Sequence, residues 1–97
     1  MHTSFLIPIY DTDVAVLRLC LNSALKAAGD QHEVVVVDDG SRRTETIEFL
    51  DRCRAAGLDN LKILHNSENN GVSYSLNKAA AAATGDLYAP VDHDDMV

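Results

Sequence analysis

Several residue types are scarce in this chain, and each shortage excludes a class of protein. The 97 residues include two cysteines, two prolines and no tryptophan. Cys20 and Cys53 lie within apolar helical patterns and lack metal-ligand spacing, so we interpret them as reduced core thiols of a cytoplasmic protein, a disulfide being the weaker alternative. The apolar run Phe5–Ile9 is too short for a signal peptide and contains Pro8, and no run approaches the length of a membrane span. We therefore expect a soluble domain.

Positive charge is scarce as well. Eight Lys and Arg residues stand against fifteen Asp and Glu residues, which gives a formal net charge of -7, and no Lys or Arg follows Lys78. An acidic surface repels phosphate backbones and anionic lipid headgroups, so we expect no nucleic-acid partner. An anionic ligand of this chain would need a metal ion beside it.

Short apolar runs alternate with amphipathic segments, which is typical of a parallel sheet covered by helices. We expect Pro8 to stop the first strand and Asp11 or Thr12 to cap the first helix. Right-handed crossovers wind this order into a three-layer αβα fold with a mostly parallel, Rossmann-like sheet of strand order 3-2-1-4. The predicted strands are Ser4–Ile7, Val34–Val37, Leu61–Leu64 and Leu87–Val91. We expect Gly29 to end the first helix, the second helix to span about residues 44–56, and the third to begin near Val72 and stop at Gly85.

Acidic residues follow two of the predicted strands. Ligands of such sheets bind beyond the carboxyl ends of the strands, beside the point where the strand order reverses. The loops at that point are Pro8–Asp11, Asp38–Ser41 and Asp92–Asp95. Clustered carboxylates repel one another unless a cation neutralises them, so the last loop indicates a divalent metal.

Five short motifs follow one another along the chain. They are Pro8-Ile9-Tyr10, Val37-Asp38-Asp39-Gly40-Ser41, Asn70-Gly71-Val72-Ser73 with Leu76-Asn77, Gly85-Asp86 and Asp92-His93-Asp94-Asp95. In order and spacing these motifs closely resemble the inverting family-2 glycosyltransferases of the GT-A fold. The resemblance covers residues 1–97, and it corresponds to the nucleotide-diphospho-sugar-binding half of that family's catalytic domain, truncated before the acceptor-binding half.

The resemblance implies roles for residues in the first three motifs. Pro8 and Tyr10 would shape the pocket floor around the nucleobase. Asp39 would accept hydrogen bonds from the uracil or ribose end of a nucleotide-sugar, and Asp38 would orient that loop. Asn77 is also a candidate substrate-binding residue, although a polar contact with a neighbouring loop explains it better than catalysis.

The resemblance also implies a metal site. Asp92 and Asp94 look like the family's Asp-x-Asp motif. Asp94 would reach the metal, and Asp92 would lie near the ribose or sugar and is the second candidate metal ligand. Mg²⁺ or Mn²⁺ held there would bridge carboxylate and diphosphate and stabilise the leaving nucleoside diphosphate.

The enzyme implied is a hexosyltransferase-type protein of polysaccharide biosynthesis. It would transfer the sugar of a nucleotide-sugar, expected to be a UDP-sugar, to an acceptor hydroxyl with inversion. The acceptor, whether glycan, lipid or protein, stays open. In this family the general base comes from downstream of Val97, so no residue here is assigned that role, and the chain alone is expected to be inactive. We expect a cytoplasmic location, with the full-length protein able to lie at the inner face of the membrane.

Each motif also has a purely structural interpretation. Asp38-Asp39-Gly40 could be a turn that caps the next helix, Asp92–Asp95 a solvated acidic tail, and Asn70-Gly71 a common turn. The alternative function is a non-catalytic module that binds metal and nucleotide. A phosphate loop and a Gly-x-Gly-x-x-Gly string do not occur in the sequence, which excludes those two nucleotide folds. The apolar last strand would leave an open sheet edge, which predicts a homo-oligomer.

Overall fold

Residues 2–91 fold as one four-stranded parallel sheet with three helices. The computed structural model describes residues 2–91. The strands lie in the order β3-β2-β1-β4, so the predicted α/β fold and strand order are confirmed. The elements are β1 (Thr3–Ile9), α1 (Val14–Ala28), β2 (Glu33–Asp38), α2 (Thr44–Ala55), β3 (Leu61–His65), α3 (Val72–Ala82) and β4 (Leu87–Pro90).

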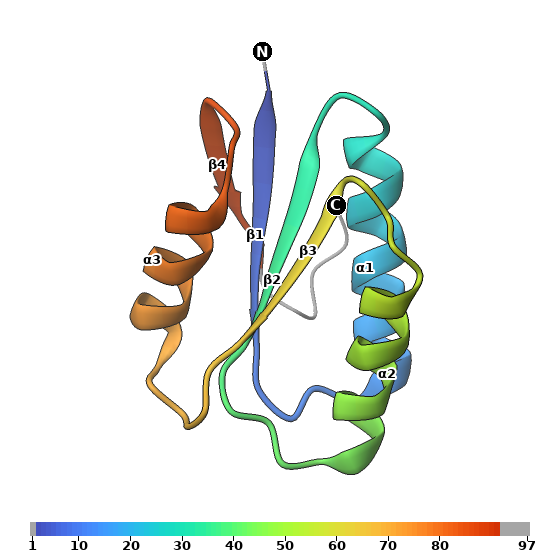
Figure 1. Ribbon diagram of the computed structural model, residues 1–97, viewed down its shortest axis with the longest axis vertical. Coiled ribbons are helices and arrows are strands. Elements are labelled where there is room, and N and C mark those ends of the chain that lie inside the picture. Colours follow the sequence, from blue (N-terminus) through green and yellow to red (C-terminus); the bar gives the residue numbers. More distant parts are fainter. Residues whose placement is uncertain (1, 92–97) are drawn as a thin grey trace.

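Helices cover both faces of the sheet. Figure 1 shows α1 and α2 together on one side and α3 on the other. All six residues of β2 are buried, because this central strand is covered on both faces, and that explains its unbroken apolar run. Val34 and Val36 belong to the core under α1 and α2, whereas Val35 and Val37 pack on the α3 side.

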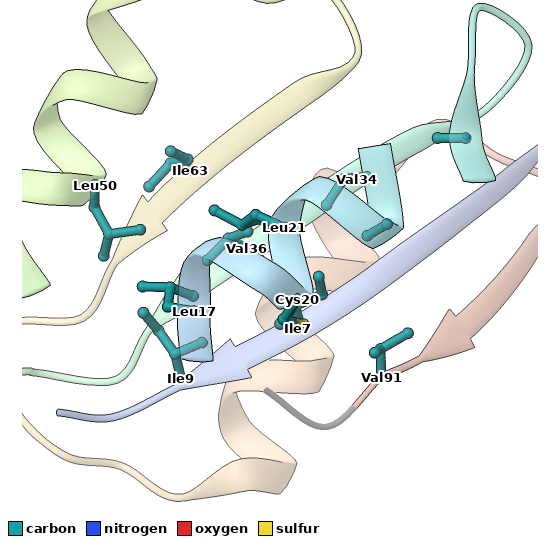
Figure 2. Close-up of a cluster of buried hydrophobic side chains, with 12 residues drawn as sticks. Ile7, Ile9, Leu17, Cys20, Leu21, Val34, Val36, Leu50, Ile63 and Val91 are labelled. Carbon is teal, nitrogen blue, oxygen red and sulfur yellow. The ribbon is translucent and has the colours of Figure 1, made fainter. Parts of the chain in front are cut away.

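The larger core lies between the sheet and the pair α1 and α2. Figure 2 shows Leu17 and Leu21 of α1 and Leu50 of α2 pointing toward the valines of β2. On the other face the core is small, and Ala79 lets α3 approach the sheet closely. Among residues 2–91, no helix combines the length and apolar character needed to cross a bilayer.

β1 does not stop at Pro8 as predicted but continues to Ile9. The carbonyl of Ile9 accepts from Asp39 N beside β2, whereas the carbonyl of Leu6 accepts from Val91 N beside β4. The backbone groups of successive β1 residues point alternately toward β2 and β4, so those of Pro8 point toward β4. Leu6 is the last β1 residue paired with β4, and Pro8 lies beyond it. The missing N–H of Pro8 therefore removes no bond of the β1–β2 ladder.

The ends of two helices also differ from the prediction. Asp13, rather than Asp11 or Thr12, caps α1, and its Oδ1 accepts from Ala15 N at 2.9 Å. α3 ends at Ala82, before Gly85. Gly85 instead packs against the start of β1, where a Cβ atom would lie 2.9 Å from the backbone N of Ser4.

Candidate functional site

Three loops meet at the carboxyl edge of the sheet, at the lower end of Figure 1. They are residues 10–13 after β1, 39–43 after β2 and 66–71 after β3. Hydrogen bonds join them in sequence. Asp11 N donates to Ser41 Oγ at 2.8 Å, and Asn66 N donates to the carbonyl of Asp38 at 2.8 Å. The edge predicted to hold the site is therefore a connected polar surface.

Asp39 lies at the centre of this edge and is only 5% exposed. Its Oδ1 accepts from Asn66 Nδ2 and from Asn70 N, both at 2.8 Å, and its Oδ2 accepts from Gly71 N at 2.8 Å. Gly71 is the N-cap of α3 and has no side chain with which to cap it. The carboxylate of Asp39 thus caps α3 from another loop, where it also meets the positive end of the helix dipole.

Asp39 is held in its ionised form. Burial raises the pKa of its carboxyl group, but the hydrogen bonds from Asn70, Asn66 and Gly71, with the hydroxyl of Ser75, outweigh burial and hold the pKa below its usual range. An ionised carboxylate can only accept hydrogen bonds. A hydrogen-bonding ligand that meets Asp39 must therefore present an N–H or O–H group.

A pocket of about 270 Å³ opens beside Asp39. Three residues predicted to bind substrate, Pro8, Tyr10 and Asp39, come together in its wall with Ile9 and Val72. The side chains of Tyr10 and Val72 are largely exposed, which leaves their apolar surfaces available to a ligand. The combination of apolar walls and one acceptor suits a flat ring that carries an N–H donor.

Asp38 faces a different space. It is 3% exposed; its Oδ1 accepts from Ser41 N at 3.0 Å, and its Oδ2 lies 3.2 Å from His65 Nδ1. Together with Tyr10, these groups line a second pocket of about 260 Å³ between the loops after β2 and β3. The two adjacent aspartates therefore serve different pockets, because neighbouring residues at a strand end point to opposite faces.

Gly40 allows the loops after β2 and β3 to touch. Its φ is +79°, and a Cβ atom built there would lie 2.6 Å from the backbone carbon of Glu68. A side chain at this position would push the two loops apart. The glycine of the second motif is thus required by a close approach of backbones.

Sequence reasoning missed several polar residues of this edge. His65 is the last residue of β3 and lies against Asp38. Asn66, which had no assigned role, is 7% exposed and bonds Asp39. Asp11 Oδ1 accepts from Arg42 N at 2.7 Å and Arg43 N at 2.9 Å at the start of α2. The position of His65 and Asn66 at the end of a strand on the ligand-binding edge was the available signal.

Other predicted site residues lie elsewhere. Asn77 is exposed on α3, outside the residues that line the two pockets. Asp92 and Asp94 lie outside the described residues. Within residues 2–91 there is no group of three or more side chains arranged to hold a metal ion. β4 ends at Pro90, and Val91 N donates to the carbonyl of Leu6 at 2.9 Å, so the chain leaves β4 beside β1 just before Asp92.

Comparison with known proteins identifies the family of the chain. Residues 4–97 match the family model described as Glycosyl transferase family 2. The chain belongs to this family. GlyG, a glycosyltransferase of Streptococcus pneumoniae, is 31% identical to this family-2 chain over 96 residues, which are 97% of this chain and 30% of GlyG. The chain spans between 23% and 30% of the length of the curated relatives it matches.

Solved structures show the same fold for this family-2 domain. S. aureus TarS (residues 1–349) in complex with UDP is 32% identical, with a TM-score of 0.79 over 99% of this chain and 28% of that chain. The same protein in complex with UDP-GlcNAc is 33% identical, with a TM-score of 0.78 over 99% and 27%. The mannosyltransferase PcManGT of Pyrobaculum calidifontis, in complex with GDP-Man and Mn²⁺, is 26% identical, with a TM-score of 0.82 over 97% and 28%.

Proposed function

We propose that residues 1–97 form the donor-binding half of an inverting glycosyltransferase domain that uses a UDP-sugar. The observation that carries the proposal is the likeness, over 99% of this chain, to TarS in complexes with UDP and UDP-GlcNAc. It is supported by the pocket that gathers Pro8, Tyr10 and Asp39 at the carboxyl edge of the sheet. This edge is where open α/β sheets bind their ligands.

The proposed base site is the pocket beside Asp39. Pro8 and Tyr10 form its floor around the uracil ring. Oδ2 of Asp39 accepts from Gly71 N, and a carboxylate oxygen can accept more than one hydrogen bond, so in this proposal it also accepts from an N–H of uracil or a hydroxyl of ribose. Asp38 orients the loop through its bond from Ser41 N. Asn77 stays a candidate for a contact with substrate farther along α3.

Asp92 and Asp94 are the proposed metal ligands, with Asp92 near the ribose or sugar. Their carboxylate oxygens are the donors that Mg²⁺ and Mn²⁺ prefer. PcManGT, of the same fold, is seen with Mn²⁺. When bound, the ion would neutralise the charge that develops on the leaving diphosphate.

The whole protein, in this proposal, is a cytoplasmic hexosyltransferase of polysaccharide biosynthesis that acts on an acceptor hydroxyl of a glycan, lipid or protein. It can lie at the inner face of the membrane. The general base lies in sequence beyond Val97, so the chain alone binds donor without transferring sugar. The open edge of β4 pairs two copies of the chain.

Calorimetric titration of the chain with UDP, with and without Mn²⁺, tests the donor site. We expect UDP to bind and Mn²⁺ to strengthen the binding. Asp39→Asn should weaken UDP binding by about tenfold or more, since an amide cannot accept with both terminal atoms. Asp51→Asn, an exposed change on α2, is the matched control and should leave the affinity unchanged. Absence of UDP binding in the unaltered chain would refute the proposal.

The alternative is a non-catalytic module that binds metal and nucleotide. Both functions predict UDP binding, so binding alone does not separate them. Transfer of sugar from a UDP-sugar by a longer form of the protein would support the enzyme, whereas binding without transfer in that form would support the module.

A further inference from the structure

Lys78 of α3 reaches back to the end of β3. Its Nζ donates to the carbonyl of His65 at 2.8 Å and to Oδ1 of Asn66 at 2.8 Å. None of the five sequence motifs includes this lysine, and it does not line the pocket beside Asp39. Its ammonium group therefore contacts residues of the polar edge without lining this pocket.

The Asn66 side chain connects Lys78 to Asp39. Nδ2 of Asn66 donates to Oδ1 of Asp39 at 2.8 Å and to Oγ of Ser75 at 3.1 Å, while its Oδ1 accepts from Lys78. Asn66 is 7% exposed, so water cannot easily replace these partners. Every polar atom of the amide is thus used inside the protein.

The ammonium group of Lys78 and the carboxylate of Asp39 together fix which way this amide faces. An amide turned by 180° would place its NH₂ group against the ammonium of Lys78 and its oxygen against the carboxylate of Asp39, and both contacts would be repulsive. Without Lys78, Oδ1 of Asn66 loses its charged partner, and one of the two interactions that hold the amide in this orientation is gone.

We propose that Lys78 is a positioning residue of the donor site: it fixes the Asn66 amide, which in turn holds the Asp39 carboxylate in place to receive the ligand. This inference rests on the proposed function, because it assumes that Asp39 meets the nucleoside part of the donor. Lys78 does not line the pocket proposed for the base, so it would act on the donor only through Asn66 and Asp39. Its effect should therefore be confined to ligands that carry a base.

The experiment measures the affinities of the unaltered chain and of Lys78→Met for UDP and for inorganic pyrophosphate, each in the presence of Mn²⁺. Pyrophosphate lacks the nucleoside and reports on the metal and diphosphate part alone. We expect Lys78→Met to weaken UDP by about tenfold, the size of one misplaced hydrogen bond, and to change pyrophosphate binding by less than about twofold. Lys26→Met, on the exposed end of α1, is the matched control and should change neither affinity.

Two further variants distinguish the proposed role of Lys78 from a general loss of folding. Lys78→Arg keeps the cation and should restore most of the UDP affinity. Asn66→Leu removes the amide but leaves the bond from Lys78 to the His65 carbonyl, and it should reproduce the UDP-specific loss even if Lys78→Met does not fold.

The outcomes are distinguishable. Equal weakening of UDP and pyrophosphate, or unchanged UDP affinity in Lys78→Met and Asn66→Leu, would overturn the role of Lys78 while the donor site stands. A chain that binds no UDP before any substitution would overturn the proposed function and this inference with it.

Discussion

Gly71 N donates to Oδ2 of Asp39 at 2.8 Å, although the two residues are 32 positions apart. This bond joins the loop after β2 to the first residue before α3, across the carboxyl edge of the sheet. The same carboxylate accepts from Asn70 N and Asn66 Nδ2. Asp39 therefore holds α3 in position as well as lining the pocket, so the proposed donor site and the packing of α3 share one side chain.

Gly40 provides the first test of this edge, because the loops after β2 and β3 touch at that residue. Gly40→Ala should lower the free energy of unfolding by several kcal/mol, since a left-handed backbone costs roughly 1–2 kcal/mol for alanine and the new Cβ atom would also lie 2.6 Å from Glu68 backbone carbon. Urea denaturation measures the loss.

Gly57→Ala is the matched control for this change. Gly57 also has a positive φ, +66°, but open space surrounds the position of its Cβ atom. It should show the backbone cost alone, about 1–2 kcal/mol. Equal losses for the two variants would show that the close approach of the loops at Gly40 contributes nothing.

The sheet and its winding could be predicted from sequence because each step rests on a strong local signal. The run Val34–Val37 has no polar residue, which only a strand buried on both faces requires, and the handedness of crossovers then limits the strand order. Pro8 misled the prediction because its cost depends on which neighbour its backbone faces. Alternation along β1 turns Pro8 toward β4, and whether a hydrogen bond is lost there depends on where the pairing with β4 ends, far along the chain.

The candidate site could be predicted only in part. The rule that ligands bind at the carboxyl edge located Tyr10 and Asp39 correctly at one edge, because strand ends are visible in the sequence. The partners of Asp39 were not visible, since an Asp before Gly40 fits a simple turn equally well. Asn66 and Lys78 belong to a different loop and helix, and their contacts arise only when α3 packs on the sheet.

Glu33, at the opposite edge of the sheet, should make stability depend on acid pH. Burial raises the pKa of Glu33, but hydrogen bonds from Ser4, Thr84 and Lys62 outweigh burial and lower the pKa from 4.5 to about 2. Because the folded pKa is depressed, the stabilisation is fully present above pH 4.5 and is lost as the pH falls toward 2.

Glu33→Gln tests this dependence. It should lower the free energy of unfolding at pH 7 by about 2 kcal/mol, since it replaces charge-assisted hydrogen bonds at Ser4 Oγ and Thr84 N by weaker ones. The difference from the unaltered chain should shrink as the pH falls below 4.5. Urea denaturation at several pH values measures the free energy of unfolding as a function of pH. Glu48→Gln, at an exposed position of α2, serves as the control. A difference between Glu33→Gln and the unaltered chain that does not change with pH would contradict the lowered pKa of Glu33.

The edge of β4 tests the predicted self-association. β4 pairs with β1 alone among the described strands, and its Leu87 is 50% exposed. An open edge with apolar side chains invites pairing with another copy, and a lysine on the edge disfavours it. Sedimentation should show concentration-dependent dimers that Leu87→Lys weakens by about tenfold or more, while Leu58→Lys, equally apolar and exposed but away from β4, does not. A strict monomer at high concentration would rule out the dimer.

Tyr10 distinguishes a stacking pocket from a merely polar one. Its ring lines both pockets at the carboxyl edge and is 44% exposed, so it can cover the face of a base without repacking the core. Stacking on an aromatic ring is worth roughly 1–3 kcal/mol per base, so Tyr10→Ala should weaken UDP binding by roughly five- to a hundredfold. Tyr10→Phe keeps the ring and should stay within about twofold of the unaltered chain, since the contact needs the ring face and not the hydroxyl.

Tyr88→Ala is the matched control for the ring, because Tyr88 is similarly exposed but lies on β4. Calorimetric titration with UDP should give the unaltered affinity for this variant. If Tyr10→Phe lost as much affinity as Tyr10→Ala, the hydroxyl group rather than the ring face would make the contact. The base would then be recognised by hydrogen bonds alone, with Asp39 as its charged acceptor.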